Sequence, residues 1–125
     1  MNVQIGVGTI IWAEVPDRNG HPKKHPAVVA SITQGTGGTL YHSVVISSTF
    51  DNPHPPNEVD VPLDTQGTGL WKDSVIVCDW VVNLSGNDIV KVLGQMPVQQ
   101  MRIIAHFLKQ RAQFLSSSGN PPDSI

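Results

Sequence analysis

The sequence contains little cysteine, few aromatic residues and no excess of positive charge. Cys78 is the only cysteine in 125 residues, which excludes an intrachain disulfide and a cysteine-based metal site. Charged residues make up 14% of the chain, aromatic residues 6%, and the formal net charge is −2 at pH 7 with neutral histidines. This balance disfavours a protein whose whole surface attracts nucleic acid, but it is compatible with a local basic site.

Long apolar runs are also missing. No stretch approaches the length of a membrane-spanning helix, and residues 1–8 lack the charged start and the apolar centre of a signal peptide. We therefore expect a soluble, cytoplasmic protein with no membrane partner. The chain is long enough for one domain with one hydrophobic core, which we assign to residues 1–115, and we expect residues 116–125 to form a flexible tail.

Glycine and proline are abundant instead, with eleven and ten copies. They divide the first two thirds of the chain into short segments rich in β-branched residues. Strands are predicted at 9–15, 27–32, 40–47, 58–63 and 74–83. The last is the most apolar, which predicts burial on both of its faces.

The period of the apolar residues changes after this strand. Ser85 is expected to cap a short helix that ends near Leu93, with Gly94 as its stop signal. Pro97 is expected to begin a longer helix, to about Phe114, whose apolar stripe faces the sheet. Short strands followed by one amphipathic helix describe a mainly β protein, with a small curled or closed sheet plugged by the helix.

The segment 16–26 (PDRNGHPKKHP) between the first two strands carries more chemistry than a plain turn requires. Three prolines exclude a helix, and Asn19-Gly20 supplies the positive φ of a reversal. The segment contains Arg18, His21, Lys23, Lys24 and His25. Cations and imidazoles on a loop between rigid strands are typical of a binding or catalytic site, although a solvated polar loop fits the composition equally well.

Several segments resemble the PemK/MazF family of toxins from bacterial toxin–antitoxin systems. They read GTIIWAEV (8–15), KHPAVVAS (24–31), VVISSTF (44–50) and SVIVCDWVV (74–82). In order and spacing they are similar to the family's motifs G-D-I-V-W, R-P-A-V-V-x-S, V-V-P-I-T-S and V-x-C-D. The resemblance implies a small SH3-like β-barrel with a C-terminal α-helix, a homodimer, and cleavage of single-stranded RNA without metal or cofactor. It also implies an antitoxin protein that neutralises the toxin.

The resemblance also implies roles for individual residues. His21 lies near the position of a loop histidine in PemK-type members, and Asp79 matches their aspartate. The family's catalytic or phosphate-binding threonine falls on Ser47, or on Ser48 if the strand is shifted by one residue. The chain departs from the family at two arginines, because Val77 replaces the one on the last strand.

The second departure is His25, which stands where an arginine contacts the scissile phosphate. RNA cleavage without metal requires a base for the 2′-hydroxyl, an acid for the departing 5′-oxygen and positive charge at the phosphate. His25 can supply that charge only while it is protonated. The predicted catalytic set is therefore His21, His25, Ser47 and Asp79, and the predicted RNA or phosphate ligands are Arg18, Lys23, Lys24, Ser48 and Lys72.

Structural interpretations compete with these roles. His25 before Pro26 fits an ordinary exposed loop residue equally well, and a carboxylate within an apolar strand predicts either a structural pairing or a base with a raised pKa for Asp79. No metal site is predicted, because the other histidines lack ligand spacing: His42, His54 and His106. Among the tryptophans, Trp12 and Trp80 are expected in the core or a dimer interface, and Trp71 is expected to be exposed enough to stack.

Two functions of different class fit this sequence. The first is a PemK/MazF-like endoribonuclease, which His21, Ser47 and Asp79 favour. The second is a catalytically degenerate module that binds a protein partner or nucleic acid without cleavage, which the replaced arginines and the net negative charge favour. We favour the first, and the two differ in whether His21, His25, Ser47 and Asp79 converge on one pocket.

Overall fold

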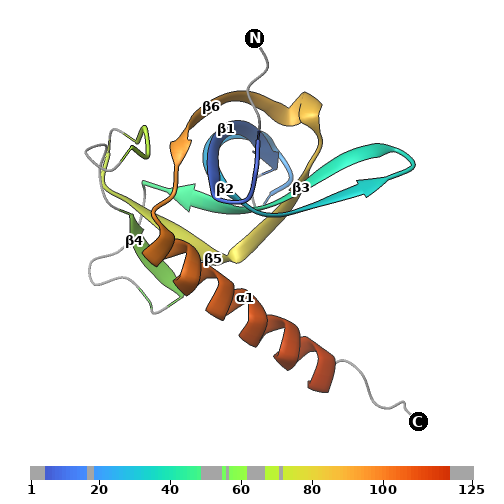
Figure 1. The fold of residues 1–125 in the computed structure, drawn as a ribbon, viewed down its shortest axis with the longest axis vertical. Helices are drawn as coiled ribbons and strands as arrows, with labels where there is room; N and C mark the ends of the chain where they lie inside the picture. Colours follow the sequence, from blue (N-terminus) through green and yellow to red (C-terminus); the bar gives the residue numbers. More distant parts are fainter. Residues whose placement is uncertain are drawn as a thin grey trace.

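Strands and one long helix account for most of the residues that the structure describes. The computed structural model describes residues 5–16, 19–48, 55, 57–61, 67–70 and 72–118, with side chains as far as residue 110. Within these residues the strands are β1 (Thr9–Pro16), β2 (Pro22–Gly35), β3 (Gly38–Ser47), β4 (Glu58–Val61), β5 (Ser74–Leu84) and β6 (Ile89–Gln95). A 3₁₀ turn, η2 (Gly86–Asp88), precedes β6, and helix α1 (Val98–Ser118) follows it (Figure 1).

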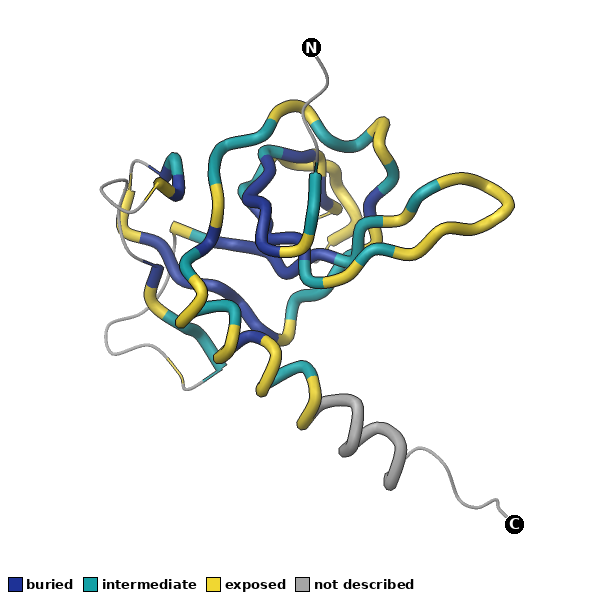
Figure 2. The backbone as a smooth tube through the Cα atoms, in the orientation of Figure 1, coloured by how far each residue is buried: buried dark blue, intermediate teal, exposed yellow. Residues whose placement is uncertain are grey.

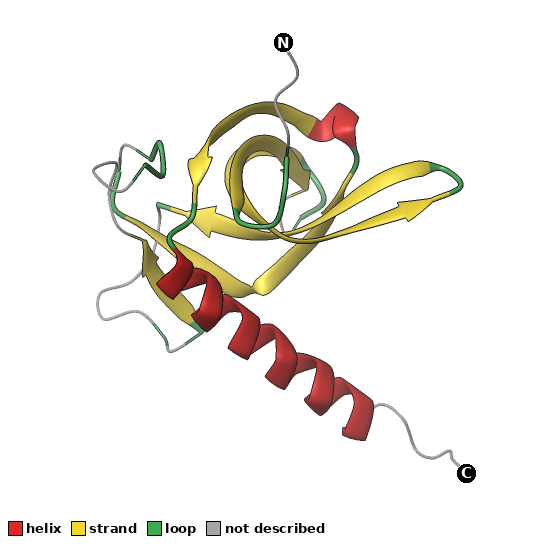
Figure 3. Ribbon diagram, in the orientation of Figure 1, coloured by secondary structure: helices red, strands yellow, loops and turns green. Residues whose placement is uncertain are grey.

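The strands form one antiparallel sheet in the order β4-β5-β3-β2-β1-β6. The sheet is strongly coiled, and α1 lies along its outside and extends beyond it (Figures 1 and 3). Between the described parts of β4 and β6, the two end strands, no hydrogen-bonded ladder forms. The predicted mainly β fold with a C-terminal helix is therefore confirmed, whereas closure into a barrel is not.

The core consists of two clusters because both faces of the central strands are buried. Successive residues of a strand point to opposite faces, and accordingly Ile10, Val28 and Val44 belong to one cluster and their neighbours Ile11, Val29 and Val45 to the other. All six side chains are fully buried. This arrangement explains why the strands read as continuous apolar runs rather than as alternating ones.

Helix α1 packs against the first cluster, as its apolar stripe predicted. Ile104 is 1% exposed, and Met101, Phe107 and Leu108 pack beside it. Val98 at the start of the helix is 65% exposed. Neither this helix nor any other in the described part of the chain is long and apolar enough to cross a membrane.

The segment 16–26 is mostly strand, so its prediction as a loop is wrong beyond residue 21. β2 begins at Pro22, which lies opposite Pro16, and Pro26 lies opposite Trp12. β3 pairs with β2 only from Ala27 onward, so the prolines lie where a missing N–H costs no hydrogen bond to β3. The reversal uses Gly20, whose φ is 84°.

The short helix predicted from Ser85 is also wrong. Ser85 caps only η2, where the carboxylate of Asp88 accepts hydrogen bonds from the Ser85 N–H at 2.9 Å and from its hydroxyl at 3.2 Å. The chain then enters β6, which pairs with β1. Ser85 does begin a short turn, as its capping signal predicted. A helix after it, however, would leave the backbone N–H and C=O groups at the edge of β1 without the hydrogen bonds that β6 supplies.

The far end of the β2–β3 hairpin extends away from the rest of the sheet and is exposed (Figure 2). His42 lies near its base. The ring Nδ1–H donates to Asn83 Oδ1 at 2.6 Å, and Nε2 forms a hydrogen bond with the Thr33 hydroxyl at 2.9 Å. These two hydrogen bonds give His42 a structural role in the hairpin.

Candidate functional site

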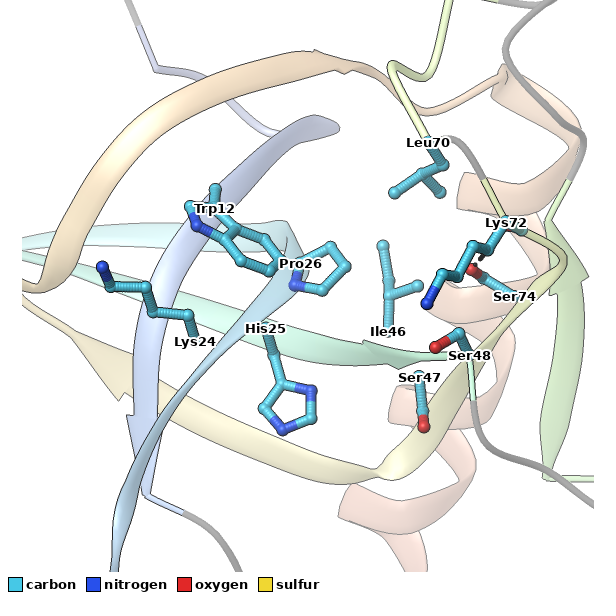
Figure 4. Close-up of a pocket in the computed structure, with 10 residues that line it drawn as sticks. All are labelled: Trp12, Lys24, His25, Pro26, Ile46, Ser47, Ser48, Leu70, Lys72 and Ser74. Atoms are coloured by element: carbon cyan, nitrogen blue, oxygen red, sulfur yellow. Dashed lines mark hydrogen bonds between the residues drawn. The ribbon is translucent and has the colours of Figure 1, made fainter.

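A cavity of about 200 Å³ lies where β1, β2, β3 and the start of β5 meet (Figure 4). Its wall has an apolar part and a polar part. The apolar part consists of Trp12, Pro26, Ile46 and Leu70, and the polar part of Lys24, His25, Ser47, Ser48, Lys72 and Ser74. None of these described lining residues is acidic, so the cavity is a local basic site in a chain of net charge −2.

The sheet register brings these distant segments together. Trp12 of β1 lies opposite Pro26 of β2, and Ser47 of β3 lies opposite Val75 of β5. β3 stands between β2 and β5 in the sheet. The cavity therefore spans four neighbouring strands that hold its residues through continuous backbone ladders.

Lys72 approaches the cavity from the turn that enters β5. The Ser74 hydroxyl donates a hydrogen bond to the Lys72 backbone oxygen at 2.9 Å (Figure 4). Ser74 is only 6% exposed, whereas the Lys72 side chain is exposed. The turn is thus fixed while the ammonium group keeps its hydration and can reach a ligand at the mouth of the cavity.

The wall at Leu70 is held by close packing on β6. Gly69 has a φ of 73°, and a side chain there would clash with the carbonyl group of Leu93. The Leu70 N–H donates to the hydroxyl oxygen of the buried Thr68 at 3.3 Å. Only glycine combines this backbone conformation with this close approach.

His25 is half-buried and makes an aromatic contact with Trp80 of β5. The ring centroids are 5.3 Å apart and the planes meet at 65°, an edge-to-face arrangement. Such contacts add about 0.5–1.5 kcal/mol beyond area burial. The contact orients the imidazole beside the cavity, and Trp80 also packs against the second core cluster, consistent with the core alternative of its predicted place in the core or a dimer interface.

The structure gathers five of the nine residues predicted for the site. These are Lys24, His25, Ser47, Ser48 and Lys72. They come from two separate stretches of sequence and from the turn before β5.

Three other predicted residues lie elsewhere. His21 and Lys23 are exposed and do not line the cavity. His21 precedes β2, which begins at Pro22 and carries His25 as its fourth residue. His21 therefore does not join His25 in the lining of this cavity. Arg18 falls outside the described residues, as do His54 and Trp71.

Asp79 is the third residue outside the cavity. Its side chain is exposed, although the continuous apolar character of this strand predicted burial on both of its faces. Between the pairs Val44↔Val81 and Ile46↔Ile76, β5 has extra residues that lack partners on β3, and the strand bends sharply there (Figure 1). The bend turns Asp79 outward within an otherwise apolar strand.

Cys78, next to Asp79, is 3% exposed. Burial, followed by the negative charge of Asp79, raises the pKa of its thiol from 9.0 to about 11. The thiol is therefore protonated at neutral pH and is a poor nucleophile. In the part of the chain that the structure describes, no three His, Cys, Asp or Glu side chains are grouped so as to hold a metal ion.

Sequence reasoning missed Trp12 as a residue of this cavity. The position of the turn residues was a signal for it, because the turn fixes which residues of a hairpin lie opposite each other. In every β1–β2 pair, from Ile10↔Val28 to Pro16↔Pro22, the two residue numbers add up to the same value. The hairpin is therefore centred on Asn19, beside the recognised turn residues. A hairpin folded about that point places Trp12 opposite Pro26 and next to His25.

A second cavity, of about 500 Å³, lies between α1 and the sheet and is almost entirely apolar. Its lining residues are Val7, Ala30, Val98, Met101, Arg102, Ile104, Ala105 and Leu108. Val7 is 57% exposed and Val98 is 65% exposed. This cavity carries one cation and no proton carrier among its described lining residues, so it does not compete with the first as a catalytic site.

Comparison with known proteins agrees with the fold. MazF from Deinococcus radiodurans superposes with a TM-score of 0.69 at 20% identity, covering 90% of this chain and 99% of that one. In a MazE–MazF structure from the same organism, the TM-score is 0.66 at 20% identity, with 89% and 97% covered. The Mycobacterium tuberculosis toxin MazF-mt6 gives 0.59 at 20% identity, with 82% and 93% covered.

No curated protein sequence matches the chain. A family model, however, matches residues 7–111, which is well over half of the sequence. It describes the PemK-like, MazF-like toxin of type II toxin–antitoxin systems, and the chain therefore belongs to this toxin family.

Proposed function

We propose that the protein is an endoribonuclease that cleaves single-stranded RNA without a metal ion and is neutralised by an antitoxin. The observation that carries this proposal is the cavity that unites His25 with two lysines and two serine hydroxyls. A cluster of cations and hydroxyl donors beside an imidazole matches what a phosphodiester needs during cleavage. Family membership supports the same reaction class.

In this proposal Lys72 and the hydroxyls of Ser47 and Ser48 bind the non-bridging oxygens of the scissile phosphate. These residues lie together on one side of the cavity (Figure 4). The 2′-oxygen attacks phosphorus, the bond from phosphorus to the 5′-oxygen breaks, and the 2′-hydroxyl proton reaches the departing oxygen through water. The products are a 2′,3′-cyclic phosphate and a 5′-hydroxyl.

His25 supplies the remaining positive charge as an imidazolium. The attacking and departing oxygens lie on opposite sides of phosphorus, so one imidazole does not serve both as base and as acid. Charge that develops on the phosphate in the transition state is stabilised most by donors fixed in advance. His25 is fixed by its strand and by its contact with Trp80.

A second candidate function is a catalytically degenerate module that binds RNA or a protein without cleavage. The position of His21 and Asp79 outside the cavity favours it. The cavity would then keep its anion-binding groups but lack a second proton carrier among the described lining residues.

The deciding experiment incubates the pure protein with a fluorogenic single-stranded RNA in EDTA. The nuclease proposal requires cleavage by the wild type, a rate at least about tenfold lower in His25→Ala and an unphosphorylated 5′ end that polynucleotide kinase labels directly. Equal cleavage by wild type and His25→Ala would indicate a contaminating nuclease. Binding without cleavage would establish the second candidate.

We also propose that the protein forms a homodimer. Apolar side chains such as Val7 and Val98 remain exposed beside the larger cavity in the single chain, and exposed apolar patches mark interaction sites. Light scattering at micromolar concentration should give twice the chain mass. Val98→Glu should then shift the mass to that of a monomer if this surface forms the interface, whereas Val90→Glu, on a valine that is 51% exposed on β6, serves as the matched control.

A further inference from the structure

The two sides of the smaller cavity differ in chemistry. Figure 4 shows Trp12 beside Pro26 on one side, Lys72 and Ser48 on the other, and Ile46 between them. One side therefore presents an aromatic and aliphatic surface, with Lys24 and His25 at its margin, and the other carries an ammonium and hydroxyl groups. A ligand that satisfies both must join an apolar ring to an anion.

The size of the cavity further limits which ligands can enter it. Pockets that enclose drug-sized molecules measure about 300–1,000 Å³, and this cavity measures about 200 Å³. It admits one ring-sized group at a time and leaves the rest of a longer molecule outside. A nucleotide within a strand fits this description, because its base has an apolar face and its phosphate carries the charge.

Trp12 is held rigidly for this purpose. Its neighbours Ile11 and Ala13 are both fully buried, and the residue is paired through β1 to Pro26. The indole itself is only half-buried. A large aromatic ring on a fixed strand, partly open to a cavity, loses little conformational entropy when a planar group stacks on it.

We infer that Trp12 is a base-stacking subsite, which receives one nucleobase of a single strand while the adjoining phosphate lies against Lys72 and the serine hydroxyls. The inference rests on the proposed function, since it identifies how the same cavity recognises its substrate. Stacking accepts every base because each has a π face, so the subsite contributes affinity and only modest sequence preference. Trp12 is accordingly a binding residue for the substrate, whereas the sequence predicted it in the core or a dimer interface.

The test measures the binding of a short 2′-O-methyl oligonucleotide, which lacks the attacking hydroxyl and is not cleaved by this route. Trp12→Leu should weaken binding by about 5- to 150-fold, the range for loss of one base–aromatic stack. Trp12→Phe keeps a ring and should lose less. Tyr41→Leu, an aromatic replacement at a residue that packs on the second core cluster away from the cavity, should bind as the wild type does.

An abasic scan of the oligonucleotide tests the same contact without altering the protein. Removing one particular base should weaken binding to wild type by the factor seen for Trp12→Leu. In Trp12→Leu, removal of that base should have no further effect, because the partner ring is already gone. Uniform effects at all positions in the wild type would overturn the subsite even if Trp12→Leu proved unstable. Equal losses in the wild type and a folded Trp12→Leu would overturn it as well.

The outcomes separate this inference from the nuclease proposal. Cleavage of RNA by wild type with unchanged binding in Trp12→Leu would overturn the stacking subsite and leave the nuclease intact. Binding that depends on Trp12 without any cleavage would overturn the nuclease and support the subsite. Failure of wild type to bind any single strand would overturn both.

Discussion

Replacement of His25 by arginine tests the proposed chemistry directly. The proposal uses the imidazolium form to stabilise a phosphate, and imidazoles ordinarily have a pKa near 6.5. Above that region the charged fraction of an ordinary imidazole falls tenfold per pH unit, so the rate at pH 8.5 should be about 100-fold below its acidic plateau. An arginine stays charged throughout this range.

His25→Arg should therefore flatten the alkaline limb of the rate profile and exceed wild type at pH 8. The substitution is compatible with the site, because guanidinium groups stack on aromatic faces and Trp80 lies 5.3 Å from the imidazole of His25. His25→Ala should lower the rate at every pH. Loss of a hydrogen bond to a charged group costs about 1.5–3 kcal/mol, which corresponds to about 10- to 150-fold in rate.

The assay is the initial rate on a fluorogenic single-stranded RNA from about pH 5.5 to 8.5, a range that brackets the ordinary imidazole pKa. Circular dichroism at each pH separates unfolding from loss of chemistry. An alkaline limb that is the same in His25→Arg as in wild type would refute the assignment of His25 to the phosphate. A dead His25→Arg enzyme at all pH values would instead make His25 the proton carrier.

The pKa of Cys78, raised from 9.0 to about 11 by burial, predicts slow labelling by a thiol reagent at pH 8 in native protein and fast labelling in urea. As the pH rises, the Cys78 thiol ionises in the unfolded chain before it ionises in the folded one. The contribution of the buried thiol to the free energy of unfolding should therefore be complete below pH 9 and lost as the pH rises toward 11. Urea unfolding of Cys78→Ala should not show this loss. Gly69→Ala should lower the free energy of unfolding by at least about 2 kcal/mol, because a left-handed backbone and a backbone clash add together. Gly37→Ala, in open space, should change it by less than about 0.5 kcal/mol. If the proposed antitoxin binds through an acidic segment placed on Lys23 and Lys24, both exposed, replacing these lysines with glutamate should weaken its binding at least about tenfold in calorimetry at low salt. Unchanged affinity would place that segment elsewhere.

Local sequence signals predicted the strands well because those signals are also physical causes. β-Branched residues between glycine and proline turns form short strands, and the continuous apolar runs reflect burial on both faces of a coiled sheet. The extension of β2 to Pro22 was not predictable in the same way. A proline-rich segment is typical of a loop. That it forms a strand becomes clear only from its pairing with β1 on one side and from the absence of β3 on the other side before Ala27.

The site residues that lie in recognisable sequence motifs were predictable. His25 and Ser47 came from recognisable motifs, and the sheet register then brought them together. His21 lies only a few residues from His25, but an extended strand carries neighbours in sequence apart in space. Asp79 depends on a bend in β5 that no local pattern announces.

The clearest error, the helix predicted after Ser85, concerns a segment on which the cavity depends. β6 pairs with β1 on one side, and its backbone at Leu93 and Gly94 packs so closely against residues 67–69 that side chains at Gly69 or Gly94 would clash. A helix in place of β6 would not present this flat backbone edge, and the wall at Leu70 would lose its support. Capping and termination signals in the sequence report only local turn preferences near Ser85 and Gly94. The segment forms a strand because it pairs with β1, which lies some eighty residues earlier in the sequence. Because β6 also supports the wall at Leu70, this long-range pairing helps to determine the shape of the candidate RNA site.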